Sequence, residues 1–75
     1  MPKLPVISGA EAIRAFERAG WQVIRVGSTR HVVLRRQGNP LALSVPEHKT
    51  LDRGLLRSLI RDAGLSVQDF TELLG

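Results

Sequence analysis

The sequence predicts an α+β fold, in which helices cover one face of a three-stranded antiparallel sheet in the order α-β-β-β-α, with a short extra helix at the C-terminus. Apolar residues recur at helical spacing near both ends of the chain, and β-branched residues alternate with polar ones in the middle. Turn residues separate these stretches. Since a three-stranded meander is too small to be stable alone, the helices have to cover its apolar face.

Length and composition limit what this chain does. It has 75 residues, with 11 Lys and Arg against 7 Asp and Glu, a net charge of +4, and no cysteine. This length predicts a single domain over residues 1–75, too small for an enclosed cofactor pocket, so no cofactor is expected. A disulfide framework and a Cys-ligated zinc site are excluded. No apolar run reaches the roughly 18 residues that span a bilayer, so we expect a soluble cytoplasmic protein without membrane contact.

The first helix is predicted to begin after Ser8 and to end at Gly20. Ser8 and Glu11 have the spacing of a capping box, in which each side chain accepts a hydrogen bond from the backbone of the other residue. Gly20 supplies the left-handed conformation that commonly ends a helix. Apolar residues at helical spacing predict one buried stripe, formed by Ala12, Ile13, Phe16 and Ala19.

Three strands are predicted over residues 21–26, 31–36 and 41–45, joined by turns at 27–29 and 37–40. Side chains alternate between the two faces of a strand. One face of the second strand therefore carries Val32, Leu34 and Arg36, and the other carries His31, Val33 and Arg35. One face of the third strand is expected to carry Leu41, Leu43 and Val45.

Pro46 has no N–H to donate and is predicted to end the third strand. Either Thr50 or Asp52 then caps a second helix, which ends at Gly64. Its apolar residues at helical spacing are Leu55, Leu56, Leu59, Ile60 and Ala63. A last helix opens at Ser66 and turns inward Val67, Phe70, Leu73 and Leu74. This layout is double-stranded RNA-binding-domain-like, with the opposite face of the sheet left free.

His31 and His48 are the first candidates for proton transfer, because histidine is the side chain that most readily exchanges protons near neutral pH. RNA carries its own nucleophile, the 2′-hydroxyl, so its cleavage needs only a base, an acid and cations that hold the phosphate. In the alternative interpretation, His31 is an ordinary surface residue and His48 braces the loop after Pro46. Two histidines on different elements predict no metal site.

Basic and hydroxyl side chains around His31 predict a phosphate-binding surface. Glycine lets a backbone approach a phosphate closely, hydroxyls hydrogen-bond it, and Arg or Lys neutralises its charge. The predicted RNA-binding residues are Ser28, Thr29, Arg30, Arg35 and Lys49. Most Gly-Ser-Thr runs are only turns, and it is the neighbouring Arg30, His31 and Arg35 that favour a phosphate-binding role for this one.

Arg53, Arg57 and Arg61 are spaced four apart and therefore line one face of the second helix. Like charges at this spacing cost roughly a few tenths of a kcal/mol per pair. A phosphate backbone or an acidic protein would relieve that repulsion. The stripe is predicted to bind one of these two partners, and the alternative is a solvated basic face.

Several segments together carry a resemblance to one family. The most specific is ArgGlyLeuLeuArgSerLeuIleArgAspAlaGlyLeuSer at 53–66, followed by Asp69-Phe70. The shorter segments are LysLeuProValIleSerGly at 3–9, Gly20-Trp21, Gly27-Ser28 before a histidine, and ValProGluHis at 45–48. Over nearly the whole chain they resemble the HicA family of small toxins from bacterial and archaeal toxin-antitoxin pairs.

The resemblance implies an mRNA interferase, which cleaves RNA without a metal and without the ribosome. It implies that His31 is the catalytic residue, since this histidine opens the second strand just after Gly27-Ser28, and that His48 is a secondary catalytic candidate. The implied partner is a HicB-type antitoxin, through which the pair reaches operator DNA. The arginine stripe of the second helix then binds either RNA or this antitoxin.

One feature departs from the family pattern, in which Gly-Ser runs directly into His, because Thr29 and Arg30 intervene here. Either a longer turn delivers His31 to the same place, which the following Val32-Val33-Leu34 favours, or the histidine was lost at Thr29. The second case predicts a non-catalytic RNA-binding module of the same fold. A further alternative is a protein-interaction domain that uses the arginine stripe.

Overall fold

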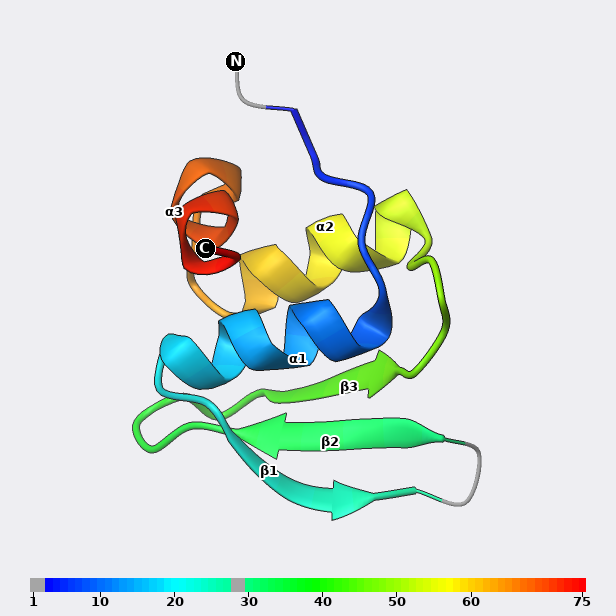
Figure 1. Cartoon of the computed structure of the whole chain (residues 1–75). Helices are drawn as coiled ribbons and strands as arrows, with labels where there is room; N and C mark the ends of the chain where they lie inside the picture. Colours follow the sequence, from blue (N-terminus) through cyan, green and yellow to red (C-terminus); the bar gives the residue numbers. More distant parts are fainter. Residues whose placement is uncertain (1–2, 28–29) are drawn as a thin grey trace.

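The computed structural model describes residues 3–27 and 30–75, and its elements follow the predicted order (Figure 1). They are α1 (Gly9–Arg18), β1 (Gln22–Val26), β2 (His31–Arg35), β3 (Ala42–Pro46), α2 (Arg53–Asp62) and α3 (Val67–Leu73). The strands form one antiparallel sheet in the order β1-β2-β3, and the helices gather on one side of it. The predicted α+β fold is confirmed. No helix within these two ranges is long and apolar enough to cross a membrane.

The strand β2 shows the predicted alternation between the two faces of the sheet. Val32 and Leu34 are buried toward the helices, whereas His31 and Val33 are half-buried and Arg35 is exposed. Residues directly opposite each other in antiparallel strands share a face. The register therefore divides the strand residues between a helix-covered face and an open face, and His31 belongs to the open face.

Large side chains from both ends of the chain meet in the core. Phe16 and Phe70 are fully buried, and Trp21 is 1% exposed. The rings of Phe16 and Phe70 have centroids 5.0 Å apart and planes tilted by 46°. Because burying such a side chain stabilises a protein by about 1.5–3 kcal/mol, this contact fixes α3 against α1.

The capping box that begins α1 is present as predicted. The backbone N–H of Glu11 donates to Ser8 Oγ over 3.1 Å, and the backbone N–H of Ser8 donates to Glu11 Oε1 over 3.1 Å. The Glu11 carboxylate accepts hydrogen bonds from the Ser8 backbone N–H and from the Ser8 hydroxyl. These bonds favour the ionised form, so they hold the pKa of Glu11 below its ordinary value, and the backbone bond has the larger effect. The helix ends before Gly20, which has the expected positive φ of 98°.

The structure decides which residue begins α2. Asp52 is the cap, not Thr50, since the Leu55 N–H donates to Asp52 Oδ2 over 3.0 Å. Ser66 caps α3 as predicted, accepting from the Asp69 N–H over 3.0 Å. Both helices thus begin on a side chain that accepts one of the backbone N–H groups that a helix start leaves unpaired.

The prediction that Leu41 belongs to the third strand, on one face with Leu43 and Val45, is wrong. Leu43 and Val45 are buried, but Leu41 lies before β3 and is 46% exposed. Its backbone N–H donates to Asn39 Oδ1 over 2.9 Å, so Leu41 belongs to the turn. An Asn side chain that bonds the backbone two residues later competes in this way with strand pairing.

Candidate functional site

His31 is held at the start of β2 by backbone contacts on both sides. It pairs with Pro46 of β3, and its carbonyl oxygen accepts from the Gly27 N–H over 2.6 Å on the β1 side. The imidazole is half-buried and points to the open face of the sheet. The sequence therefore places a histidine at the rim of the uncovered face of the sheet.

Arg30 precedes His31 in an uncommon backbone conformation, with a φ of 59°. Its N–H donates to the Gly27 carbonyl over 3.2 Å, and its carbonyl accepts from the Glu47 N–H over 2.9 Å. A non-glycine residue in the left-handed region costs roughly 1–2 kcal/mol. The two hydrogen bonds hold the exposed Arg30 in this conformation directly beside His31.

His48 lies at the same end of the sheet as His31, two residues beyond the Pro46 that pairs with His31. Its carbonyl oxygen accepts from the Gly9 N–H over 2.9 Å, while its side chain is exposed. The approach of α1 is so close that a Cβ on Gly9 would lie 2.0 Å from the Pro46 carbonyl oxygen. We call this region the histidine end, formed by Gly9, Arg30, His31 and residues 46–48. Lys49 follows it and is exposed.

The open face of the sheet also carries two exposed arginines. Arg35 is exposed on the same face of β2 as His31, and Arg25 of β1 pairs with Val33 on that face. The predicted phosphate contacts of Ser28 and Thr29 lie outside the described residues. Arg25 was not among the predicted phosphate contacts. The sequence feature that could have identified it is a single arginine within the aliphatic residues of the first strand.

The arginine stripe of α2 occupies a different surface. Arg53, Arg57 and Arg61 are all exposed on the side of α2 away from the core, and α2 belongs to the helix layer. The stripe runs about 12 Å along the helix at 1.5 Å per residue. Arg61 Nε lies 3.7 Å from Asp62 Oδ1, an exposed ion pair of little energetic consequence. The structure thus separates the stripe from the open face of the sheet.

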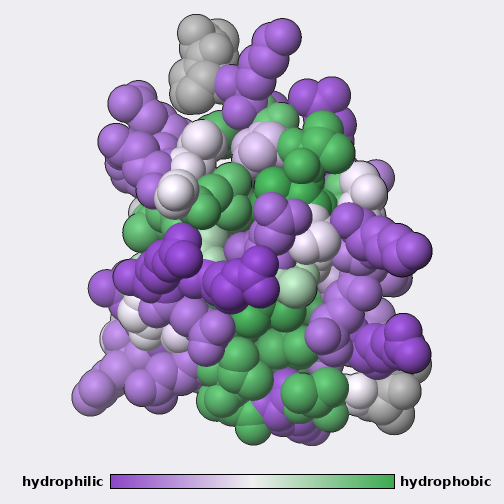
Figure 2. Space-filling view, viewed as in Figure 1, coloured by the Kyte–Doolittle hydropathy of each residue, from purple (hydrophilic) through white to green (hydrophobic). Residues whose placement is uncertain are grey.

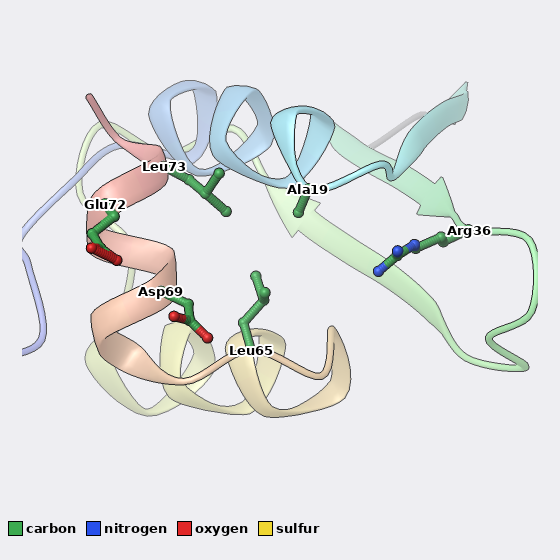
Figure 3. Close-up of a pocket in the computed structure, with 6 residues that line it drawn as sticks. All are labelled: Ala19, Arg36, Leu65, Asp69, Glu72 and Leu73. Atoms are coloured by element: carbon green, nitrogen blue, oxygen red, sulfur yellow. The ribbon is translucent and has the colours of Figure 1, made fainter.

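Two surface hollows lie at the opposite end of the sheet and share Arg36, the residue after β2. One of about 440 Å³ lies between the end of α1, the end of β2, α3 and the loop before α3, as Figure 3 shows. It is lined by Ala19, Arg36, Leu65, Asp69, Glu72 and Leu73. The other, of about 350 Å³, is lined by residues 36–39 with Ala63 and Gly64. We call this region the Arg36 end. Neither hollow contains a histidine, so their volume does not identify the reactive site.

Within the described residues, no group of three His, Cys, Asp or Glu side chains is placed to hold a metal ion. The arrangement at the histidine end can instead transfer protons through imidazole and hold a phosphate with guanidinium groups.

The similarity of this chain to known proteins lies in one family model. No curated protein gives a significant match to the chain. The model of the family described as the HicA toxin of bacterial toxin-antitoxin systems matches residues 9–65, from the start of α1 to the end of the loop after α2. This match covers the sheet, the histidine end and the arginine stripe. The chain therefore belongs to the HicA family of toxins.

Proposed function

We propose that this toxin is an endoribonuclease that cleaves mRNA without a metal and without the ribosome, and that a HicB-type antitoxin neutralises it. Membership of the family makes the chain a toxin with a cognate antitoxin. The observation that carries the proposal is the position of His31, fixed by β-ladder contacts at the rim of the open face. Arg35 and Arg25 lie on the same face.

In the proposed reaction, the RNA 2′-oxygen attacks the adjacent phosphorus while the bond from phosphorus to the 5′-oxygen breaks. A base takes the 2′-hydroxyl proton and an acid gives a proton to the leaving 5′-oxygen. His31 performs one of these transfers, and His48 is the candidate for the other because it lies at the same end of the sheet. Arg30, next to His31, stabilises the negative charge that builds up on the reacting phosphate. Arg35 lies four residues further along β2, about 13 Å away, and holds another phosphate of the same RNA strand.

The test compares the parent chain with His31→Ala on a defined RNA in the presence of EDTA. A positioned general acid or base contributes about 10²–10⁴-fold, so we expect a loss of at least about 10²-fold in cleavage rate with unchanged RNA affinity. His48→Ala, an exposed histidine at the same end, is compared in the same assay and reports whether both histidines act.

Cleavage that needs a divalent metal, or that His31→Ala leaves unchanged, would contradict the proposed mechanism. If the parent chain binds RNA but does not cleave it, the chain is a non-catalytic RNA-binding module. In either case RNA affinity should fall steeply with salt, because phosphate contacts release counterions. Growth arrest on expression without antitoxin would separate the toxic enzyme from the binding module.

A further inference from the structure

The strand β1 exposes an apolar surface along the edge of the sheet. Val23, Ile24 and Val26 are 40%, 56% and 64% exposed, although β-branched side chains usually pack in a sheet interior. In Figure 1, β1 is the strand farthest from the helices, and Figure 2, in the same view, shows apolar side chains gathered at this lower part of the molecule. We call these three residues the β1 apolar edge.

A β-bulge explains why Val23 and Val26 lie on the same side of the sheet. The pairing of β1 with β2 shifts between Val23 and Arg25, so Ile24 is the extra residue. Val23 then pairs with Leu34, and Val26 with Val32, so both point to the helix-covered side although they are three residues apart. The helices do not extend far enough to bury them, since both remain at least 40% exposed.

The other side of the same edge is basic. Arg25 of β1 and Arg35 of β2 lie on the open face, and Arg35 pairs with Gln22 of β1. The outer edge of β1 has no neighbouring strand in the described part of the chain, because the sheet order is β1-β2-β3. Its outward N–H and C=O groups are therefore available to another strand.

We propose that the cognate antitoxin docks here by adding an extended segment to the outer edge of β1, with apolar residues on the helix side alternating with acidic residues on the open face. Strand addition supplies backbone hydrogen bonds and lets alternate side chains select the partner. The apolar residues cover the β1 apolar edge, and the acidic ones pair with Arg25 and Arg35. A second copy of this chain is a poor occupant, since two chains of charge +4 repel each other.

The position of this surface also suggests how the antitoxin silences the toxin. An added strand lies about 10 Å from β2, at two strand spacings of roughly 4.8 Å. Its acidic residues compete with RNA phosphate for Arg25 and Arg35 on the face that carries His31. Only this consequence rests on the proposed nuclease function, whereas the docking itself does not.

The first experiment measures the affinity of the purified HicB-type antitoxin for the parent chain and for the double variant Ile24→Thr, Val26→Thr by calorimetry. Threonine keeps the β-branched shape but leaves hydroxyls to be buried, so we expect at least about tenfold weaker binding. Val6→Thr is the matched control, because Val6 is an aliphatic residue 73% exposed outside the sheet, and it should bind like the parent. Equal affinity of the double variant and the parent would overturn the inference.

A second measurement needs no substitution. Hydrogen exchange of residues 22–26 should slow in the complex, and unchanged exchange there would overturn strand addition. If the free chain forms a stable dimer and the double variant does not, the edge binds a second copy instead.

The substitution Arg25→Gln tests the charged part of the proposal. It should weaken antitoxin binding severalfold and reduce the salt dependence of that binding.

These readouts separate the two proposals, because antitoxin binding is measured without RNA. If the parent chain does not cleave RNA, the proposed function fails while the docking result stands. If the free double variant cleaves RNA like the parent but still binds antitoxin as tightly, only the docking inference fails.

Discussion

The two ends of the sheet are built in opposite ways. At the histidine end, backbone groups meet directly: Gly9 donates to the His48 carbonyl, and a Cβ on Gly9 has no room beside Pro46. At the Arg36 end, side chains enclose open hollows, and a Cβ on Gly64 would meet nothing within 4 Å. The comparison teaches that close packing, rather than empty volume, marks the end of the sheet where this fold holds His31.

The largest expected effect comes from filling the tight contact. Gly9→Ala should destabilise the chain by about 2 kcal/mol or more, because α1 or the end of β3 has to move. For a domain of this size that loss lowers Tm by on the order of 10 °C. Calorimetric unfolding measures it, and RNA cleavage measured below the new Tm should also fall because Pro46 pairs with His31. A variant as stable and as active as the parent would remove the distinction between the two ends.

At the Arg36 end, the matched substitution Gly64→Ala should cost only about 1 kcal/mol. Gly64 has a φ of 77° but open space around it, so the cost comes from the left-handed backbone alone. Gly64→Asn should cost less, since asparagine tolerates this conformation. Denaturant unfolding gives these values. RNA cleavage should be unchanged in both variants, and a cleavage defect would place the Arg36 end in the active machinery.

Arg30 allows charge and backbone conformation to be separated at the histidine end. Arg30→Ala and Arg30→Gly both remove the charge, but only glycine relieves the φ of 59°. We expect the glycine variant to be more stable than the alanine variant by about 0.5–1 kcal/mol. Both should lose the same severalfold in RNA affinity at low salt. Unequal RNA affinities would mean that the turn conformation, and not only the charge, contributes to binding.

The smallest effect concerns the start of α1 beside Gly9. Ser8 lowers the pKa of Glu11 in the folded chain relative to the ordinary value of 4.5, so the ionised carboxylate stabilises the fold above that pH. This stabilisation disappears as the pH falls from 4.5 through the lower folded-state pKa. Glu11→Gln should therefore flatten the pH dependence of unfolding in this range, measured by denaturant titrations at several pH values. If the free energy of unfolding of Glu11→Gln changes with pH as in the parent, the capping box does not contribute to the acid sensitivity of the fold.

The elements with regular patterns were predictable from sequence. The spacing of Ser8 and Glu11 predicts the start of α1, and strand alternation places His31 and Arg35 on one face, as observed. Leu41 was misplaced because an apolar residue next to a strand fits the alternation equally well. Its actual position depends on one hydrogen bond to Asn39, which a pattern of apolar residues does not contain.

The details that complete the candidate site depend on contacts between distant segments. The closeness of Gly9 to Pro46 follows from how α1 crosses the end of β3, and no local pattern encodes that distance. The bulge at Ile24 had a weak signal, since Val23, Ile24 and Val26 break strict alternation. The roles of His31 and His48 in catalysis remain predictions.

The contact between Phe16 and Phe70 has a consequence for the order in which the fold forms. The strand pairings join near neighbours in sequence, whereas this ring contact joins residues near the two ends of the chain. Pairings with short loops form early, and contacts between distant residues form late. We therefore expect the sheet to form before α3 docks on α1. The core closes only when Phe70 reaches Phe16, which leaves an interval in folding in which the sheet lacks its full helical cover.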